Sequence, residues 1–198
     1  MSGTSKSKLK IAIYGGSFNP PHLGHEEVVK TVLKSLSPEK LLIMPDYMPP
    51  HKELAEGSPS PEQRLEMCRL AFAGNEKAEI SDLEILRGGR SYTSETLSRL
   101  KEEYVNADFY LVIGSDMLLS FNTWHEYQYI LNNCTLAVVT RNGDDLPELE
   151  EALLGDAVIL PHVPVVISSS KIREDIDANK EFLSADVYRY IKENNLYK

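Results

Sequence analysis

The chain has 198 residues, 42% of them hydrophobic, and a formal net charge of -9. Broad nucleic-acid binding needs a basic face that displaces condensed counterions, and this acidic balance argues against it. The longest apolar stretches, such as 109–113 and 163–167, are far shorter than the roughly 20 residues of a membrane helix. We therefore expect a soluble protein that binds neither nucleic acid nor a membrane.

The start of the chain and its two cysteines bear on compartment and domain number. Residues 1–8 are polar and lack the apolar segment of a signal peptide, so we interpret them as a flexible lead-in. Cys68 and Cys134 lie far apart in apolar periodic segments, as expected of small buried hydrophobes in a reducing compartment. We expect a cytoplasmic protein whose residues 9–198 form a single domain around one core.

Apolar runs typical of strands recur along the chain, with amphipathic helical patterns between them. In chain order, strands are predicted over 9–14, 40–44, 78–85, 109–113, 135–140, 158–160 and 163–167. Helices are predicted over 23–36, from the end of a loop at 61 to about 73, over 93–103, as two short segments within 115–132, over 146–154, from 168, and over 183–194. This alternation predicts an α/β fold in which helices cover both faces of a parallel sheet.

The segment after the first predicted strand carries the strongest functional signal. Residues 15–25 read Gly-Gly-Ser-Phe-Asn-Pro-Pro-His-Leu-Gly-His. In an open α/β sheet, ligands bind at the carboxyl ends of strands, and a helix N-terminus there offers N–H groups to anions. Gly15 and Gly16 permit close approach of the backbone and positive φ, and His22 and His25 fall on one face of a helix start. We expect a phosphate site.

Other interpretations of this segment are weaker. The spacing fits neither a mononucleotide P-loop nor a dinucleotide fingerprint. A Gly/Pro turn whose histidines are satisfied locally is the competing structural interpretation, and the strand-turn-helix context disfavours it. A zinc site is weaker still, because only Glu26 could add a third ligand to the two histidines.

The His-x-Gly-His core of this segment resembles the nucleotidyltransferase superfamily, and the full string resembles the bacterial nicotinate-nucleotide adenylyltransferase family. Four further segments match that family in order, namely Pro-Pro-His-Lys (49–52), Ser-Tyr-Thr (91–93), Gly-Ser-Asp (114–116) with Trp124, and Ile-Ser-Ser-Ser-Lys-Ile-Arg (167–173). The resemblance implies a Rossmann-like, doubly wound, mainly parallel sheet with a small C-terminal helical part. It also implies adenylyl transfer from ATP to nicotinate mononucleotide, a step of NAD biosynthesis, with Mg²⁺ held mainly by phosphates.

The resemblance assigns roles to individual residues. The implied catalytic residues are His22, His25, Lys52 and Arg173. The implied ATP-binding residues are Gly15, Gly16, Ser17, Phe18, Gly114, Asp116, Ile167, Ser169, Ser170 and Arg173. The implied acceptor-binding residues are Asp46, Thr93, Trp124 and His125. Taken singly, Lys52 is also typical of a solvated surface charge, Asp116 of a helix N-cap, and Trp124 of a core residue.

The nature of the acceptor is the least constrained point. In the family, backbone N–H groups near Thr93 and Trp124 receive the pyridine carboxylate, which would favour the acid over the amide. Asp46 stands where many members have asparagine, and an acid there would repel an anionic acceptor unless it is paired or points away. The rival hypotheses are nicotinamide mononucleotide or phosphopantetheine as acceptor, and a non-catalytic nucleotide sensor. A homo-oligomer also stays open.

Overall fold

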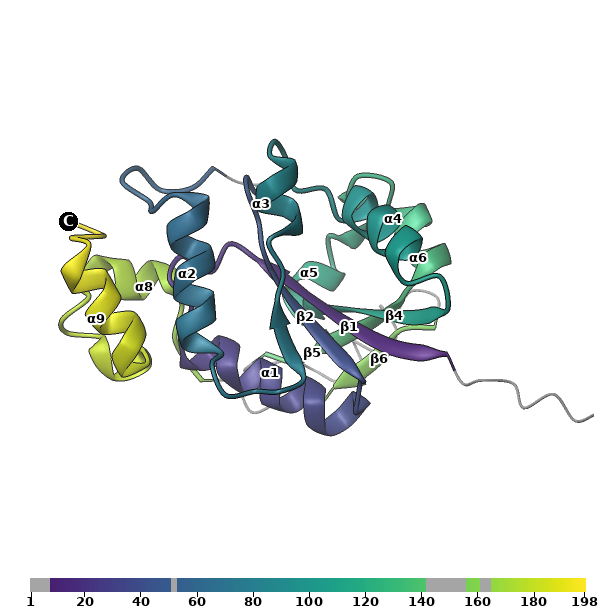
Figure 1. Ribbon diagram of the computed structural model, residues 1–198, viewed down its shortest axis with the longest axis horizontal. Helices are drawn as coiled ribbons and strands as arrows, with labels where there is room; N and C mark the ends of the chain where they lie inside the picture. Colours follow the sequence, from purple (N-terminus) through teal and green to yellow (C-terminus); the bar gives the residue numbers. More distant parts are fainter. Residues whose placement is uncertain (1–7, 51–52, 142–155, 161–164) are drawn as a thin grey trace, which may run out of the picture.

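The computed structural model describes residues 8–50, 53–141, 156–160 and 165–198 (Figure 1). Within these residues, one sheet of six parallel strands has the order β3-β2-β1-β4-β5-β6. The strands are β1 (Leu9–Gly16), β2 (Lys40–Pro45), β3 (Ala78–Ile80), β4 (Ala107–Gly114), β5 (Thr135–Val139) and β6 (Val158–Leu160). This is the order of doubly wound nucleotide-binding sheets, so the predicted α/β class is confirmed.

Helices lie on both faces of the sheet and at one end of it (Figure 1). They are α1 (Leu23–Leu36), α2 (Pro61–Ala71), α3 (Leu83–Arg87), α4 (Thr93–Glu103), α5 (Ser115–Leu118), α6 (Tyr127–Asn133), α8 (Ser169–Glu174) and α9 (Ala185–Glu193), with 3-10 turns η1 (Phe121–Thr123) and η2 (Lys180–Phe182). Within the described ranges, no helix is long and apolar enough to cross a membrane.

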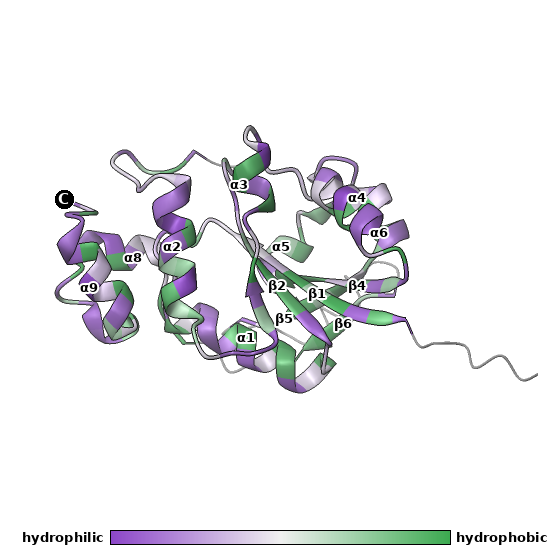
Figure 2. Cartoon of the chain, in the orientation of Figure 1, coloured by the Kyte–Doolittle hydropathy of each residue, from purple (hydrophilic) through white to green (hydrophobic). Residues whose placement is uncertain are grey.

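The strands are apolar on both faces because both faces are covered (Figure 2). Successive side chains of a strand point to opposite faces, and Ile11 and Ile13 accordingly pack with α4 and α6, whereas Ala12 packs with α1. A third cluster joins α2 to the C-terminal helices through Met67, Ile172, Ile176, Leu183, Val187 and Ile191. The predicted small C-terminal helical part is this cluster.

One predicted strand is wrong in its second half. β3 ends at Ile80, and the remainder of the predicted strand 78–85 turns into α3. The Ser81 N–H still donates to the Ile43 carbonyl at 2.9 Å, but the Ser81 hydroxyl then accepts the Leu83 N–H at 3.3 Å. A side chain that captures a nearby backbone N–H competes with the sheet ladder, and here it ends the strand.

Other sequence predictions fall wholly or partly outside the described residues. Residues 1–7 of the predicted lead-in and the whole predicted helix 146–154 lie outside the described residues. Of the predicted strand 163–167, residues 165–167 are described and are not a strand. The single-domain prediction for 9–198 stays a prediction.

The strand order changes direction between β1 and β4, which lie side by side at the centre of the sheet. Ligands of doubly wound sheets bind beyond the carboxyl ends of the strands at this switch point. Gly16 ends β1 and Gly114 ends β4. The fold therefore brings the segment 15–25 and the segment that starts at Gly114 to the same edge.

The central strands should dominate stability. Val138 of β5 is fully buried, whereas Val105 is 88% exposed. Val138→Ala should lower the free energy of unfolding by about 2 kcal/mol, because it leaves a cavity between sheet and helices. Val105→Ala, a change of the same size, should alter it by less than about 0.5 kcal/mol. Urea unfolding of both variants measures the difference, and equal effects would contradict this description of the core.

Candidate active site

Gly15 and Gly16 at the end of β1 keep the extended conformation of the strand. Gly15 and Gly16 continue the strand in parallel register with Met44 and Pro45, and neither has positive φ. The left-handed conformation in this turn falls on Phe18, with φ of 44°. Its ring is buried among other aromatic rings, so Phe18 could meet a ligand only through its backbone.

Two imidazoles close the N-terminus of α1. The Gly24 N–H donates to Nδ1 of His22, the N-cap residue, and the His22 N–H donates to Nδ1 of His25, each at 3.1 Å. The ring centroids are 3.8 Å apart. Because Nδ1 of each ring accepts a hydrogen bond, the neutral rings carry their proton on Nε2. Both histidines can therefore present an Nε2–H donor at the sheet edge.

Gly24 leaves room for the His22 ring. A Cβ atom at Gly24 would lie 3.0 Å from Cε1 and Nδ1 of the His22 ring, and 3.7 Å from Cγ2 of Ile167. A larger residue would therefore press on the ring and shift it from its capping position by a few tenths of an ångström. Ile167, which precedes the N-cap of α8, also lies close to this helix start.

An ion pair occupies the other side of the switch point. Nε of Arg141, just beyond β5, donates to Oδ1 of Asp116 at 2.8 Å. A Cβ atom at Gly114 would lie 2.5 Å from that carboxylate oxygen and 3.0 Å from Nε of Arg141, so the pair would have to move if another residue ended β4. Asp116 lies in the first turn of α5 and Gly114 is its N-cap, so the N-cap interpretation of Asp116 is wrong.

The start of α8 is fastened to the turn after β1. Ser168 is the N-cap, and its hydroxyl accepts the Lys171 N–H. The Ser169 hydroxyl donates to the Pro20 carbonyl at 2.9 Å, and Arg173 donates to the Asn19 carbonyl at 2.7 Å and to the Ser170 hydroxyl at 3.1 Å. The predicted second helix start therefore adjoins the first, because its side chains hold the two residues that precede Pro21 and His22.

The predicted acceptor residues also lie together. Thr93 begins α4, and its neighbour Tyr92 stacks on His125 with ring centroids 4.4 Å apart. The Ser94 hydroxyl lies 3.1 Å from Nδ1 of His125. Trp124 is half-buried and packs on Phe121. The segments of Thr93 and of Trp124 thus meet side by side.

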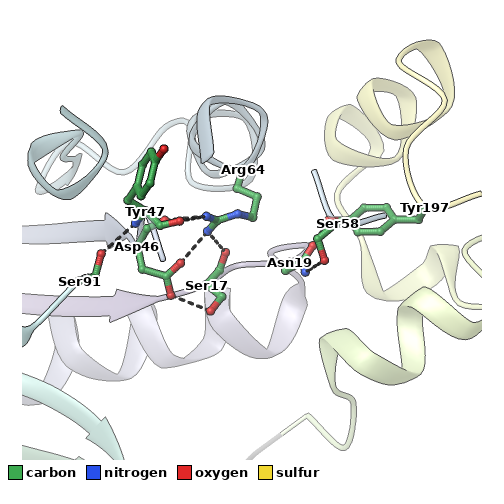
Figure 3. A network of polar contacts seen from close by, with 8 residues as sticks. All are labelled: Ser17, Asn19, Asp46, Tyr47, Ser58, Arg64, Ser91 and Tyr197. Atoms are coloured by element: carbon green, nitrogen blue, oxygen red, sulfur yellow. Dashed lines mark hydrogen bonds and ion pairs between the residues drawn. The ribbon is translucent and has the colours of Figure 1, made fainter. Parts of the chain in front are cut away.

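Asp46 is paired rather than exposed to an acceptor (Figure 3). Its Oδ1 accepts Nη1 of Arg64 at 2.9 Å, and its Oδ2 accepts the Ser17 hydroxyl at 2.7 Å. Its partner Arg64, which was not among the predicted site residues, is fully buried on α2. The sequence pattern did indicate a buried arginine, because Arg64 lies on the same helix face as Met67 and Cys68. A charge on such a face needs a partner, since burying an unpaired charge is costly.

A second polar contact in Figure 3 reaches the turn from the C-terminal region. The Tyr197 hydroxyl donates to Oδ1 of Asn19 at 2.8 Å, and Nδ2 of Asn19 donates to the Ser58 hydroxyl at 2.8 Å. Burial raises the pKa of Tyr197, so its hydroxyl stays a donor at neutral pH. Asn19 is therefore held at both its side chain and its carbonyl.

Known proteins share both the sequence and the fold. The profile of the Cytidylyltransferase-like family matches residues 13–175. A Fusobacterium nucleatum relative named "Probable nicotinate-nucleotide adenylyltransferase" is 40% identical over 187 residues, which cover 93% of this chain and 95% of the relative. The chain belongs to the nicotinate-nucleotide adenylyltransferase family. A Listeria innocua relative of the same name is 36% identical, over 96% of this chain and 98% of the relative.

Solved structures with the same fold are more distant in sequence. Plasmodium falciparum nicotinic acid mononucleotide adenylyltransferase complexed with NaAD has a TM-score of 0.80 at 22% identity, covering 96% of this chain and 97% of that one. A putative nicotinate-nucleotide adenylyltransferase from Vibrio parahaemolyticus has a TM-score of 0.69 at 22% identity, with coverages of 96% and 95%. The adenylyltransferase fold thus extends over nearly the whole chain.

For this adenylyltransferase family member, the structure gathers most of the sequence-predicted site residues at one sheet edge. His22, His25, Ser169, Ser170 and Arg173 converge on the turn after β1. Lys52 lies outside the described residues, so its predicted role stays a prediction. The described ranges contain no group of three or more His, Cys, Asp or Glu side chains that could hold a metal ion.

The state of His22 can be tested by titration. Burial, and to a smaller extent the charge of Arg141, lowers the pKa of His22 to about 4. An unfolded histidine titrates near 6.5, so the unfolded chain binds more protons between these values. The contribution of His22 to stability should be complete above about pH 6.5 and be lost as the pH falls towards 4, by roughly 3 kcal/mol in all.

NMR of the His22 ring should give a midpoint near the lowered pKa, and His22→Asn should flatten the dependence of unfolding free energy on pH over this window. A midpoint at the ordinary histidine value would contradict the buried, neutral ring.

Proposed function

We propose that the chain transfers the adenylyl group of ATP to nicotinate mononucleotide, giving nicotinate adenine dinucleotide and pyrophosphate. The observation that carries this proposal is the pair of capping imidazoles at the switch point, both with the proton on Nε2. A phosphate beyond the end of β1 would meet these donors and the positive end of α1 together. Membership of the adenylyltransferase family supports the same reaction.

This reaction asks little covalent chemistry of the protein. The acceptor phosphate is already an anionic nucleophile and pyrophosphate is the leaving group, so no general base is required. Catalysis then depends on holding the attacking oxygen in line with the α-phosphorus of ATP and on stabilising the charge on its oxygens. Neutral donors such as His22 and His25, with the guanidinium of Arg173 anchored beside them, suit that task.

The start of α4 favours an acidic acceptor. Its N-cap Tyr92 makes no side-chain capping bond, so the Tyr92 side chain does not occupy the first N–H groups of the helix, near Thr93. Such N–H groups and the positive helix end stabilise a carboxylate, whereas an amide would present a donor to donors. Trp124 and the stacked pair Tyr92 and His125 would then border the pyridine ring.

Mg²⁺ would enter with ATP. It would be held mainly by phosphate oxygens and water, which suit the oxygen preference of this cation. Such a cation would neutralise phosphate charge. We place the enzyme in the cytoplasm, in keeping with two cysteines that form no disulfide.

The reaction and its acceptor are tested by one comparison. Purified protein with ATP and Mg²⁺ should release pyrophosphate with nicotinate mononucleotide, and kcat/KM should be at least about tenfold lower with nicotinamide mononucleotide, because the amide loses the bonds of the carboxylate. Phosphopantetheine should give no release. Equal rates with acid and amide would reject the acceptor assignment, and no release with any of the three would reject the activity.

Replacing His25 tests the role of the two capping histidines, on which the proposal rests. His25→Ala removes one donor to the phosphates and should lower kcat/KM by roughly 100- to 1000-fold, as for other groups that stabilise transition-state charge. The loss of one capping bond should cost stability only about 1 kcal/mol. Lys34→Ala, at an exposed position of the same helix, is the control and should leave both quantities unchanged. A His25→Ala protein with full turnover would contradict the proposal.

A further inference from the structure

The buried guanidinium of Arg64 joins two loops of the site (Figure 3). Nη1 donates to the Ser17 carbonyl at 2.7 Å and to Oδ1 of Asp46 at 2.9 Å. Nη2 donates to the Asp46 carbonyl at 2.7 Å and to the Tyr47 carbonyl at 3.0 Å. One rigid fork thus holds the turn after β1 and the loop after β2 at a fixed separation.

The same network reaches the acceptor side. The Ser17 hydroxyl donates to Oδ2 of Asp46, which closes a ring of contacts through Arg64. The Tyr47 N–H donates to the Ser91 hydroxyl at 2.9 Å, and Ser91 lies two residues before Thr93. The contacts therefore run from the turn that carries the two histidines to the segment proposed to receive the pyridine carboxylate.

Stability alone does not account for an arginine at this position. The side chain is fully buried, and its Nε has no hydrogen-bond partner in the described part of the chain. A buried ion pair is often no more stabilising than well-packed apolar residues of the same volume, because both charges lose their hydration. Arg64 also cannot contact substrate phosphates from this buried place. What the guanidinium supplies is a set of directed bonds with fixed spacing.

We propose that Arg64 is a positioning residue for adenylyl transfer, which sets the distance between the loop that receives ATP and the segments that receive the acceptor. The inference rests on the proposed function. In-line attack requires the two substrates to be placed to within about an ångström, and a displacement of that size can cost up to about 100-fold in rate. Each substrate still meets its own loop, so binding depends on Arg64 less than turnover does.

The test is Arg64→Lys, which keeps the charge but replaces the fork by a single point donor. We expect kcat to fall by roughly 10- to 100-fold while KM for ATP changes by less than about threefold. Arg69→Lys on the same helix is the matched control, because Arg69 is half-exposed and pairs only with Glu66 among the described residues. It should keep the wild-type kcat and KM.

Rates are expressed per folded molecule, with the folded fraction taken from urea unfolding, so that a purely structural role is recognised. An Arg64→Lys protein with a lowered unfolding midpoint but wild-type kcat would overturn the inference. If that variant does not fold, Arg64→Gln, which keeps an amide donor but loses the fork and its spacing, should lower kcat by about tenfold or more, and an unchanged kcat there overturns it equally. A wild-type chain without pyrophosphate release instead rejects the proposed function itself.

Discussion

The site depends on a helix cap made from two imidazoles. Most helices begin with a hydroxyl, carboxamide or carboxylate cap, but α1 uses Nδ1 of His22 and of His25. The position of each ring and the location of its proton are therefore consequences of helix geometry. The same cap leaves little space for a side chain at residue 24, and the Phe18 ring packs edge-on against His25 with ring centroids 5.0 Å apart. The hydrogen bonds that cap the helix are thus the same ones that orient the Nε2–H donors of the two histidines.

Much of the framework could be predicted because its causes are local. The apolar run of β4 indicates a strand covered on both faces, and the segment 15–25 lies directly after the first strand. What failed depended on competition between nearby groups. The Ser81 hydroxyl captures a backbone N–H and ends β3 early. The left-handed conformation of Phe18 is a further local choice that no sequence pattern indicated. Hydrophobic periodicity in the sequence does not indicate which local hydrogen bond forms or which residue of a turn becomes left-handed.

Arg64 and Asp46 show why charges are hard to interpret from sequence. Alone, Asp46 would repel an anionic acceptor, and Arg64 would be expected at the surface. The fold pairs them across 18 positions and buries both, so that each explains the other. Pairing of this kind depends on the approach of α2 to the end of β2, which is a property of packing. An acid at position 46 is therefore compatible with an anionic substrate nearby, since its charge is compensated within the protein.

The bond between Tyr197 and Asn19 spans 178 positions of the chain. Translation proceeds from the N-terminus, so the turn after β1 leaves the ribosome long before the residue that secures its asparagine. During synthesis that turn has its strand and helix but lacks one of its fastenings. A nascent chain would then complete the turn after β1 only once Tyr197 has left the ribosome, so the order of synthesis sets the order in which this turn is fixed.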